Sequence, residues 1–304
     1  MIKINSSYKY LVFFFALISL ISFSEISNSQ EIRSDQCAAT IPVGGLVDAV
    51  CETQPTIQKI IFHKVAFCTA IPTAPTLTAA TVMTSCSTVF ENTAGTTVSI
   101  QKGVGTIPAG TFTDPPFGNY TFAYIELNPR LTYQANLVFS GSRALSSDED
   151  NIPEVGGVNN CQTNGTDNFY WDFLKGITCQ DGAVPAAETV NFLNSLDNNL
   201  AQYEGRFPGT NGDTDVFLTK INGTLATNEA IPEENGRAAV GNVAKLVIFL
   251  PMTAKITPDT TSYNLRYNNS RGMVVWNNVN NAQANIKFNI GFNVAYFDMT
   301  FEIQ

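Results

Sequence analysis

The stretch from Ile286 to Gln304 reads IKFNIGFNVAYFDMTFEIQ, and it decides the fold class of the chain. Apolar side chains occupy every second position from Ile286 to Tyr296, which is the period of a β-strand and not of a helix. After Tyr296 the alternation slips by one residue and continues from Phe297 to Ile303. Such a slip exchanges the two faces of a strand, so we expect either a β-bulge or a bend that carries the chain from one sheet to another.

The composition limits the class of protein and its partners. The chain has 304 residues, of which 44% are hydrophobic and only 14% charged, and its formal net charge is −9. A low charged share combined with many Asn, Thr and Gly residues suits an extracellular β protein better than a helical cytosolic one. The acidic balance and the lack of a basic cluster disfavour nucleic acid and anionic membrane surfaces as partners.

The first residues have the features of an export signal. Lys3 and Lys9 precede an apolar run from Leu11 to Phe23, which is short for a membrane span but has the length of a signal-peptide core. Because Ser27-Asn28-Ser29 offers a small-residue cleavage site, we expect residues 1–29 to be a signal peptide that is removed. The mature chain is then secreted or held at the cell surface, with the periplasm as an alternative location and no membrane span. A retained N-terminal anchor is the rival interpretation.

Six cysteines are consistent with export, because disulfides persist in oxidising compartments. Six cysteines allow 15 pairings, and separations of 14, 18 and 18 positions favour bridges between neighbours in the sequence. The predicted bridges are Cys37–Cys51, Cys68–Cys86 and Cys161–Cys179. The chain has no CxxC motif and a single histidine, so zinc binding and thiol redox chemistry fit less well.

The remaining sequence supplies short strand signals separated by turn residues. We therefore predict an all-β fold, an antiparallel β-sandwich of two packed β units, with at most one short helix at Glu188–Tyr203. Residues 141–160 are rich in Ser, Asp, Glu and Gly and have little to bury, which is typical of a linker or a long surface loop. This places an N-terminal β domain at 30–140 and a C-terminal β domain at 161–304.

Three local patterns give sharper expectations. Asn92-Thr93-Ala94-Gly95 has the composition of a hairpin turn between two strands, and Asn128-Pro129 is expected to be a second turn. The segment Ala244 to Leu250 is apolar on both faces, so it should be a central strand. Pro251 is expected to end that strand, because proline cannot donate a ladder hydrogen bond.

Candidate binding residues are few. Asp213 and Asp215 could be calcium ligands, since calcium binds clustered loop carboxylates, although a solvated acidic turn is the plainer interpretation. Trp171 and Trp276 could stack on a sugar, although most aromatic side chains of a sandwich belong to the core. His63 lies within a strand and no G-x-S-x-G motif accompanies it, so we predict no catalytic residue, no enzyme activity and no cofactor.

Three segments resemble uncharacterised secreted β-rich proteins of marine bacteria. They are HKVAFCT at 63–69, STVFENTAGTTVSI at 87–100, and the stretch from IPAGTF to YTFAYIEL at 107–127. The resemblance covers mainly residues 57–140. It implies an exported bacterial product, and it brings no activity or site with it.

These observations favour a non-enzymatic structural or interaction protein at the cell surface, adhesin-like or a filament-forming subunit. Its long terminal strand could add to the sheet edge of a neighbour, so the expected partners are further copies of the chain or other surface proteins. The alternative is an extracellular β-sandwich module that binds carbohydrate or another ligand. An outer-membrane β-barrel is a third interpretation of the amphipathic strands, disfavoured by the cysteines and the long loops.

Overall fold

The computed structural model describes residues 2–5, 51–101, 105–145, 155–169, 176–180, 182, 185–193, 203–207, 209–227, 242–270, 272–278, 287–292 and 298–304. Every regular element within these ranges is a β-strand, which confirms the predicted all-β fold. The segment predicted as a short helix, Glu188–Tyr203, contains strand β12 (Thr189–Phe192), and residues 194–202 of it lie outside the described ranges. Nothing in the described ranges is a helix long and apolar enough to cross a membrane.

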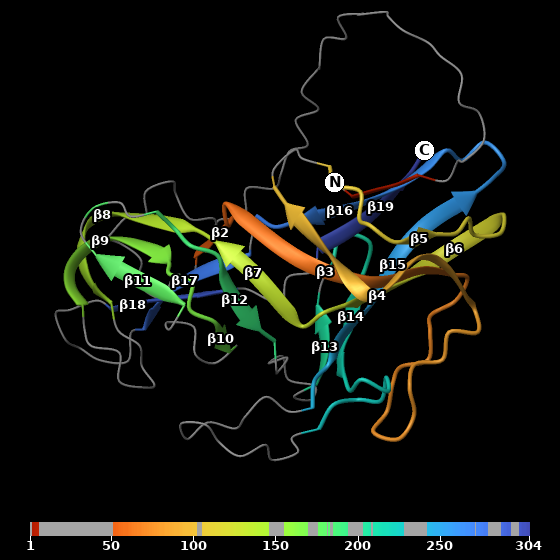
Figure 1. Cartoon of the computed structure of the whole chain (residues 1–304), viewed down its shortest axis with the longest axis horizontal. Helices are drawn as coiled ribbons and strands as arrows, with labels where there is room; N and C mark the ends of the chain where they lie inside the picture. The colour runs from red at the N-terminus through yellow and green to blue at the C-terminus, as the bar shows by residue number, and fades with distance from the viewer. Residues whose placement is uncertain are drawn as a thin grey trace, which may run out of the picture.

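The largest sheet, called here the central sheet, contains ten strands. They are β3 (Ile57–Cys68), β4 (Cys86–Ile100), β5 (Thr111–Phe112), β6 (Gly118–Leu127), β7 (Arg130–Gln134), β10 (Asn168–Phe169), β12 (Thr189–Phe192), β13 (Glu204–Phe207), β14 (Thr214–Thr219) and β15 (Lys245–Ile256). The order is β10-β12-β7-β3-β6-β15-β14-β13, with β4 paired to β3 and β5 paired to β4 (Figure 1). All these pairs are antiparallel except β10 with β12.

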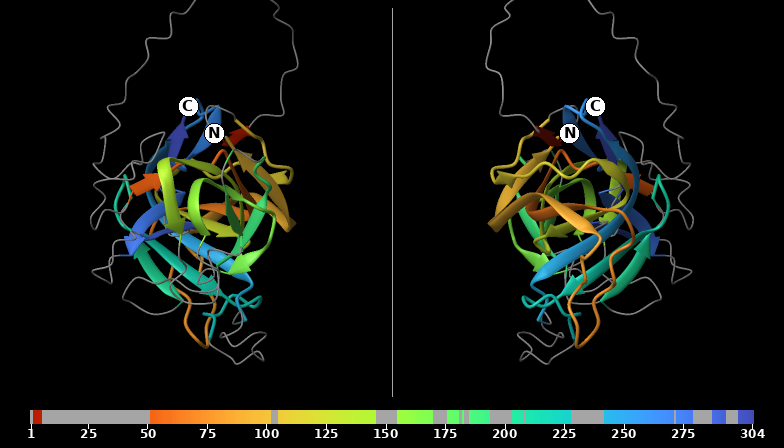
Figure 2. Two further views of the ribbon diagram at one scale, coloured as in Figure 1. Left: turned by 90° about the vertical axis from the view of Figure 1, so that its left-hand side faces the viewer. Right: turned by 90° about the vertical axis from the view of Figure 1, so that its right-hand side faces the viewer.

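Two smaller sheets complete the described fold. The end sheet has the order β1-β16-β19, and its strands are β1 (Ile2–Asn5), β16 (Ser262–Asn268) and β19 (Asp298–Ile303). The side sheet has the order β11-β9-β8-β18-β17-β2. Its strands are β2 (Cys51–Thr53), β8 (Asn136–Leu145), β9 (Val155–Thr163), β11 (Ile177–Gln180), β17 (Met273–Asn278) and β18 (Lys287–Phe292). Figure 2 shows both chain termini at the same end of the molecule.

The terminal stretch forms two strands in two different sheets. β18 pairs with β17 in the side sheet, whereas β19 pairs with β16 in the end sheet. Of the two expectations for the slip after Tyr296, the bend between sheets is therefore confirmed, and residues 293–297 lie outside the described ranges. β16 and β17 are likewise divided between these two sheets, so the described strands of residues 262–304 form two antiparallel pairs, β16 with β19 in the end sheet and β17 with β18 in the side sheet.

The predicted hairpin turn at residues 92–95 is wrong, because this segment lies within one strand. Both halves of β4 pair with β3 in the same direction, with Glu91 opposite Lys64 and Thr96 opposite Phe62. The four intervening residues of β4 lie opposite His63 alone, so they form an enlarged bulge. The Asn92 side chain supports the bulge, because it accepts a hydrogen bond from Ala94 N–H (3.1 Å) and donates one to the Ala109 carbonyl (2.8 Å).

The predicted turn at Asn128-Pro129 is also wrong, because the chain does not reverse there. β6 and β7 both run antiparallel to β3 and pair with successive parts of it, so the chain continues in the same direction with a kink between them. At the kink, Asn128 N–H donates to the Ile61 carbonyl (2.9 Å) and Asn128 Oδ1 accepts from Arg130 N–H (2.9 Å). On the edge away from β3, β6 pairs with β15 and β7 pairs with β12. The kink therefore divides the sheet into two directions.

β15 is central, as predicted, but it does not end at Pro251. It lies between β6 and β14, and residues Leu246 to Leu250 are all buried. The strand continues to Ile256 because its register with β6 shifts between Pro251 and Ala254. A bulge is one of the few places where a strand tolerates a residue without an N–H donor.

The predicted two domains share one sheet. β6, from the predicted N-terminal unit, pairs along most of its length with β15, from the predicted C-terminal unit. Residues 141–145 and 155–160 of the predicted linker belong to β8 and β9, which pair with each other, while residues 146–154 lie outside the described ranges. Ladder hydrogen bonds come from the backbone, so a segment of small polar residues can form a strand without a large apolar pattern.

An aromatic cluster joins the central sheet to the end sheet. The ring of Phe67 on β3 is fully buried, and its centroid lies 5.4 Å from that of Tyr263 on β16 and 5.2 Å from that of Phe301 on β19. Tyr120 on β6 completes the cluster at 5.8 Å. The two edge-on contacts of Phe67 with Tyr263 and Phe301 add to the free energy of burial, so the cluster holds the end sheet against the central sheet.

We predict that Gly95→Ala destabilises the fold by about 1–3 kcal/mol, because the bulge leaves no room for a side chain. A Cβ at Gly95 would lie 2.6 Å from Ile61 Cγ2 and 2.8 Å from His63 Cε1, and the φ angle is +82°. The matched control is Gly118→Ala, where a Cβ would meet nothing within 4 Å. Urea unfolding checks this expectation, and identical midpoints for the two variants would contradict it.

Candidate functional site

The predicted calcium ligands lie beside a cation of the protein itself. Asp215 on β14 lies opposite Arg206 on β13, and the two form a forked pair with Nε–Oδ1 at 2.6 Å and Nη2–Oδ2 at 3.2 Å. Hydrogen bonding to Asp215 raises the pKa of Arg206, and the charge of exposed Asp213 acts in the same direction. Among the described residues, no group of three or more His, Cys, Asp or Glu side chains comes together. Asp215 is therefore engaged by a cation of the chain, and calcium binding at Asp213 and Asp215 stays a prediction.

No described site of the structure contains both tryptophans. Trp276 lies in β17, where its backbone is opposite Asn289 of β18. Trp171 lies outside the described residues, so the sugar-stacking hypothesis for this pair stays a prediction. The imidazole of His63 is half-buried and lies under the bulge of β4, beside Gly95, where it fills space between β3 and β4.

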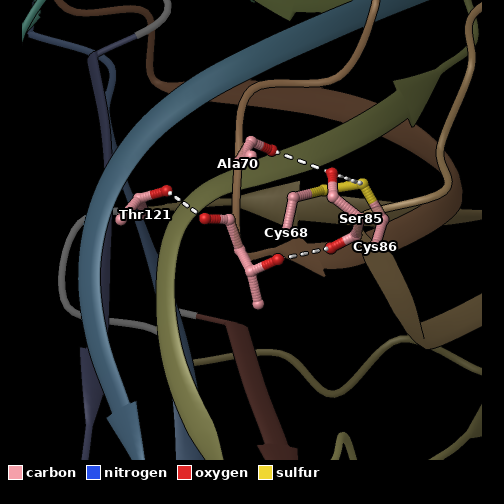
Figure 3. The surroundings of a disulfide bond; sticks show 6 residues. Cys68, Ala70, Ser85, Cys86 and Thr121 are labelled. Atoms are coloured by element: carbon pink, nitrogen blue, oxygen red, sulfur yellow. Dashed lines mark hydrogen bonds between the residues drawn. A yellow bond between two sulfur atoms is a disulfide. The ribbon is translucent and has the colours of Figure 1, made fainter.

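One predicted disulfide, Cys68–Cys86, is confirmed. The two residues lie directly opposite each other on β3 and β4, with their Cα atoms 4.0 Å apart (Figure 3). The base of the loop beyond the bridge is held by Thr69 N–H donating to the Ser85 carbonyl (2.9 Å). Thr121 Oγ1 of β6 donates to the Thr69 carbonyl at 3.1 Å, so the bridge also borders the next strand of the sheet.

The other four cysteines are placed less completely. Cys161 is disulfide-bonded, and it lies opposite Cys179 in the register of β9 and β11, the position that the predicted Cys161–Cys179 bridge requires. Cys51 lies in β2, and Cys37 is outside the described residues. No cysteine among the described residues is free.

We predict that replacing Cys68 and Cys86 together by alanine lowers the free energy of unfolding by about 3 kcal/mol, because the loop closed by the bridge gains freedom in the unfolded chain. The loop spans a sequence separation of 18. Limited proteolysis should also cut the variant faster between residues 70 and 84. Unchanged urea unfolding and unchanged cleavage would contradict the structural role of the bridge.

A pocket of about 640 Å³ opens beside the Asn128-Pro129 kink. Four segments far apart in the sequence meet there: the kink itself, the end of β12, the turn after β14 and the segment before β15. The lining residues are Asn128, Pro129, Arg130, Phe192, Lys220, Ile221, Asn222, Asn242, Val243 and Ala244.

Two of the residues that line this pocket are cationic, in a protein that is acidic as a whole. Arg130 and Lys220 contribute positive charges, and the described lining includes no acidic residue. The Arg130 guanidinium lies 5.3 Å from the centroid of the Phe192 ring, which holds the cation by a cation–π contact. The side-chain oxygens of Asn128 and Asn222 accept backbone N–H groups at 2.9 and 3.1 Å, so their NH₂ ends remain as donors. Donors and cations in this arrangement suit a carboxylate or a sulfate group.

Sequence reasoning missed this pocket for a definite reason. Its two cations, Arg130 and Lys220, are separated by about a third of the chain, and neither belongs to a local motif. They meet because the kink at Asn128-Pro129 and the turn at Lys220 to Gly223 lie at the same end of the central sheet.

The second arrangement with functional potential is the end sheet. Its middle strand, β16, is flanked by β1 and β19, and Arg266 of β16 forms an ion pair with Glu302 of β19 (Nη2–Oε2, 2.7 Å). Among the described strands, none pairs with the outer edge of β19. Comparison with known protein families, with curated proteins and with solved structures finds no match to this chain.

Proposed function

We propose that the protein is an extracellular or cell-surface structural protein that acts through contacts with copies of itself or with other surface proteins, and that it has no catalytic role. The observation that carries the proposal is the end sheet. Its outer strand, β19, presents a row of backbone N–H and C=O groups for which the described strands provide no partner. Such an edge can add a strand from another chain through main-chain hydrogen bonds.

The covalent structure and the start of the sequence support the same proposal. A disulfide between neighbouring strands stabilises a protein that leaves the reducing cytosol. The basic residues Lys3 and Lys9 and the apolar run from Leu11 to Phe23 supply the signal for that export. An exported sheet protein with an unpaired edge has the properties required of an adhesin-like or filament-forming subunit.

The test of this function is the assembly state of the chain without its leader. We expect purified residues 30–304 to associate increasingly with concentration in light scattering, and to form ordered particles or fibres in negative stain. Circular dichroism should show that the sheet content is the same before and after association. A chain that stays monomeric over a wide concentration range and binds no surface protein would overturn the proposal.

A second candidate function rests on the pocket beside the Asn128-Pro129 kink. We propose that it binds a saccharide that carries carboxylate or sulfate groups. Its two cations and its amide donors match such a ligand, whereas the net charge of −9 would repel anions elsewhere on the surface. The pocket replaces the two tryptophans as the place where a ligand-binding role is best supported.

We predict that changing both Arg130 and Lys220 to glutamine weakens binding of a polyuronate by tenfold or more, because each lost charged hydrogen bond costs about 1.5–3 kcal/mol. The control is Arg266→Gln, which removes an exposed cation of the end sheet and should leave the affinity unchanged. Calorimetry with a polyuronate and with a neutral glucan measures the effect. Equal affinity of the double variant and the parent chain would remove this candidate function.

A further inference from the structure

The strand β1 occupies a position in the fold that export would empty. Residues Ile2 to Asn5 pair with β16, and Ile2 and Ile4 lie opposite Leu265 and Tyr263. The same residues lie within the segment 1–29 that the sequence marks for removal. When that segment is cleaved, the edge of β16 occupied by β1 loses its partner, and none of the described strands then pairs with either outer edge of the remaining β16–β19 pair.

The hydrogen-bonding direction of each residue in β16 follows from one pair. Ser262 and Gln304 exchange both backbone hydrogen bonds, each at 3.1 Å. Because bonded and non-bonded positions alternate along an antiparallel pair, Asn264 and Arg266 also direct their N–H groups towards β19. Tyr263 and Leu265 therefore direct theirs to the opposite edge, where β1 lies.

We propose that, in the exported chain, the vacated edge of β16 receives the β19 strand of a second copy. This inference rests on the proposed structural function and names its partner. Within one chain, β19 already pairs with β16, so that Ile303 lies opposite Tyr263 and Phe301 lies opposite Leu265. Ile303 and Phe301 are the non-bonded positions of the β16–β19 pair. Their N–H groups therefore point to the outer edge of β19.

The second copy fits the vacated edge in pattern and in charge. The vacated edge was filled by a segment with apolar residues opposite Tyr263 and Leu265, and β19 has apolar residues at the same spacing. Tyr263 and Leu265 are 2% and 1% exposed, so an incoming strand continues a sheet that is already packed on the core. Glu302 of the second copy would come near Arg266, which is 46% exposed and already pairs with Glu302 of its own chain.

The contact is head-to-tail, because it joins two different edges of the same sheet. Each added copy leaves its own vacated β16 edge or its own β19 edge open at the end of the assembly. A heterologous contact that does not close into a ring generates an open filament. The strand order along the filament is then β16-β19 repeated from copy to copy.

The experiment returns β1 to the chain without the apolar leader. The complemented chain consists of residues 1–8, a Gly/Ser linker as long as the segment it replaces, and residues 30–304. A tethered strand acts at an effective concentration on the order of mM, so it should outcompete other copies at µM concentrations and keep the chain monomeric. The chain 30–304 should assemble under the same conditions, with a midpoint at least about tenfold lower in concentration.

Two proline variants of the complemented chain are the matched controls. Ile2→Pro with Ile4→Pro removes the two N–H groups directed at β16, so this chain should assemble like residues 30–304. Lys3→Pro with Asn5→Pro removes N–H groups that point away from β16, so it should stay monomeric. In assemblies mixed from ¹⁵N-labelled and ¹³C-labelled chains, solid-state NMR should detect intermolecular transfer between β16 and β19.

Each contrary result has its own meaning. If the complemented chain assembles as readily as residues 30–304, the inference is overturned while the proposed structural function stands. If transfer links β16 to a strand other than β19, the choice of β19 as the incoming strand is overturned. If residues 30–304 never assemble, the inference is overturned, and the proposed function fails with it only if the chain also binds no other surface protein.

Discussion

The fold depends on β3 being hydrogen-bonded along both of its edges. β4 covers one edge, and β6 followed by β7 covers the other, so every part of the central sheet is connected through β3. The kink at Asn128-Pro129 divides this arrangement, because it directs β6 towards β15 and β7 towards β12. A backbone constraint of this kind explains why strands from the two halves of the sequence are interleaved.

The aromatic cluster around Phe67 carries the same constraint into the second layer. Phe67 is fixed on β3 between its two partner strands, and its ring contacts Tyr263 and Phe301 of the end sheet. The buried face of the end sheet therefore packs on the central sheet, while its two edge strands, β1 and β19, come from the two ends of the chain. The surface with functional potential is thus supported by the buried core around β3.

The sequence was informative where the side-chain pattern alone decides the structure. The slip after Tyr296 predicted a bulge or a change of sheet, and the structure shows the change of sheet, while the spacing of Cys68 and Cys86 correctly predicted their bridge. It was misleading at residues 92–95 and 128–129, because bulges and kinks use the same Asn, Gly and Pro residues as turns. The pairing with β3 distinguishes a bulge or a kink from a turn, because β3 pairs with the chain on both sides of each irregularity.

The candidate sites were harder to predict, because they are made by segments distant in the sequence. The pocket combines Arg130 with Lys220, and no local motif marks either residue. The junction of the central and side sheets likewise depends on buried Thr163, whose hydroxyl accepts from Ala135 N–H (3.1 Å) and donates to the Ala187 carbonyl (2.5 Å). A single threonine in a threonine-rich chain gives no sequence signal for this role.

Amide hydrogen exchange in β16 tests most directly whether β1 closes one edge of the end sheet. The comparison is between the chain that retains residues 1–8 through a linker and dilute residues 30–304. We expect the amides of Tyr263 and Leu265 to be protected in the first chain and to exchange quickly in the second, while those of Asn264 and Arg266, which bond to β19, are protected in both. Equal protection of Tyr263 and Leu265 in the two chains would contradict it.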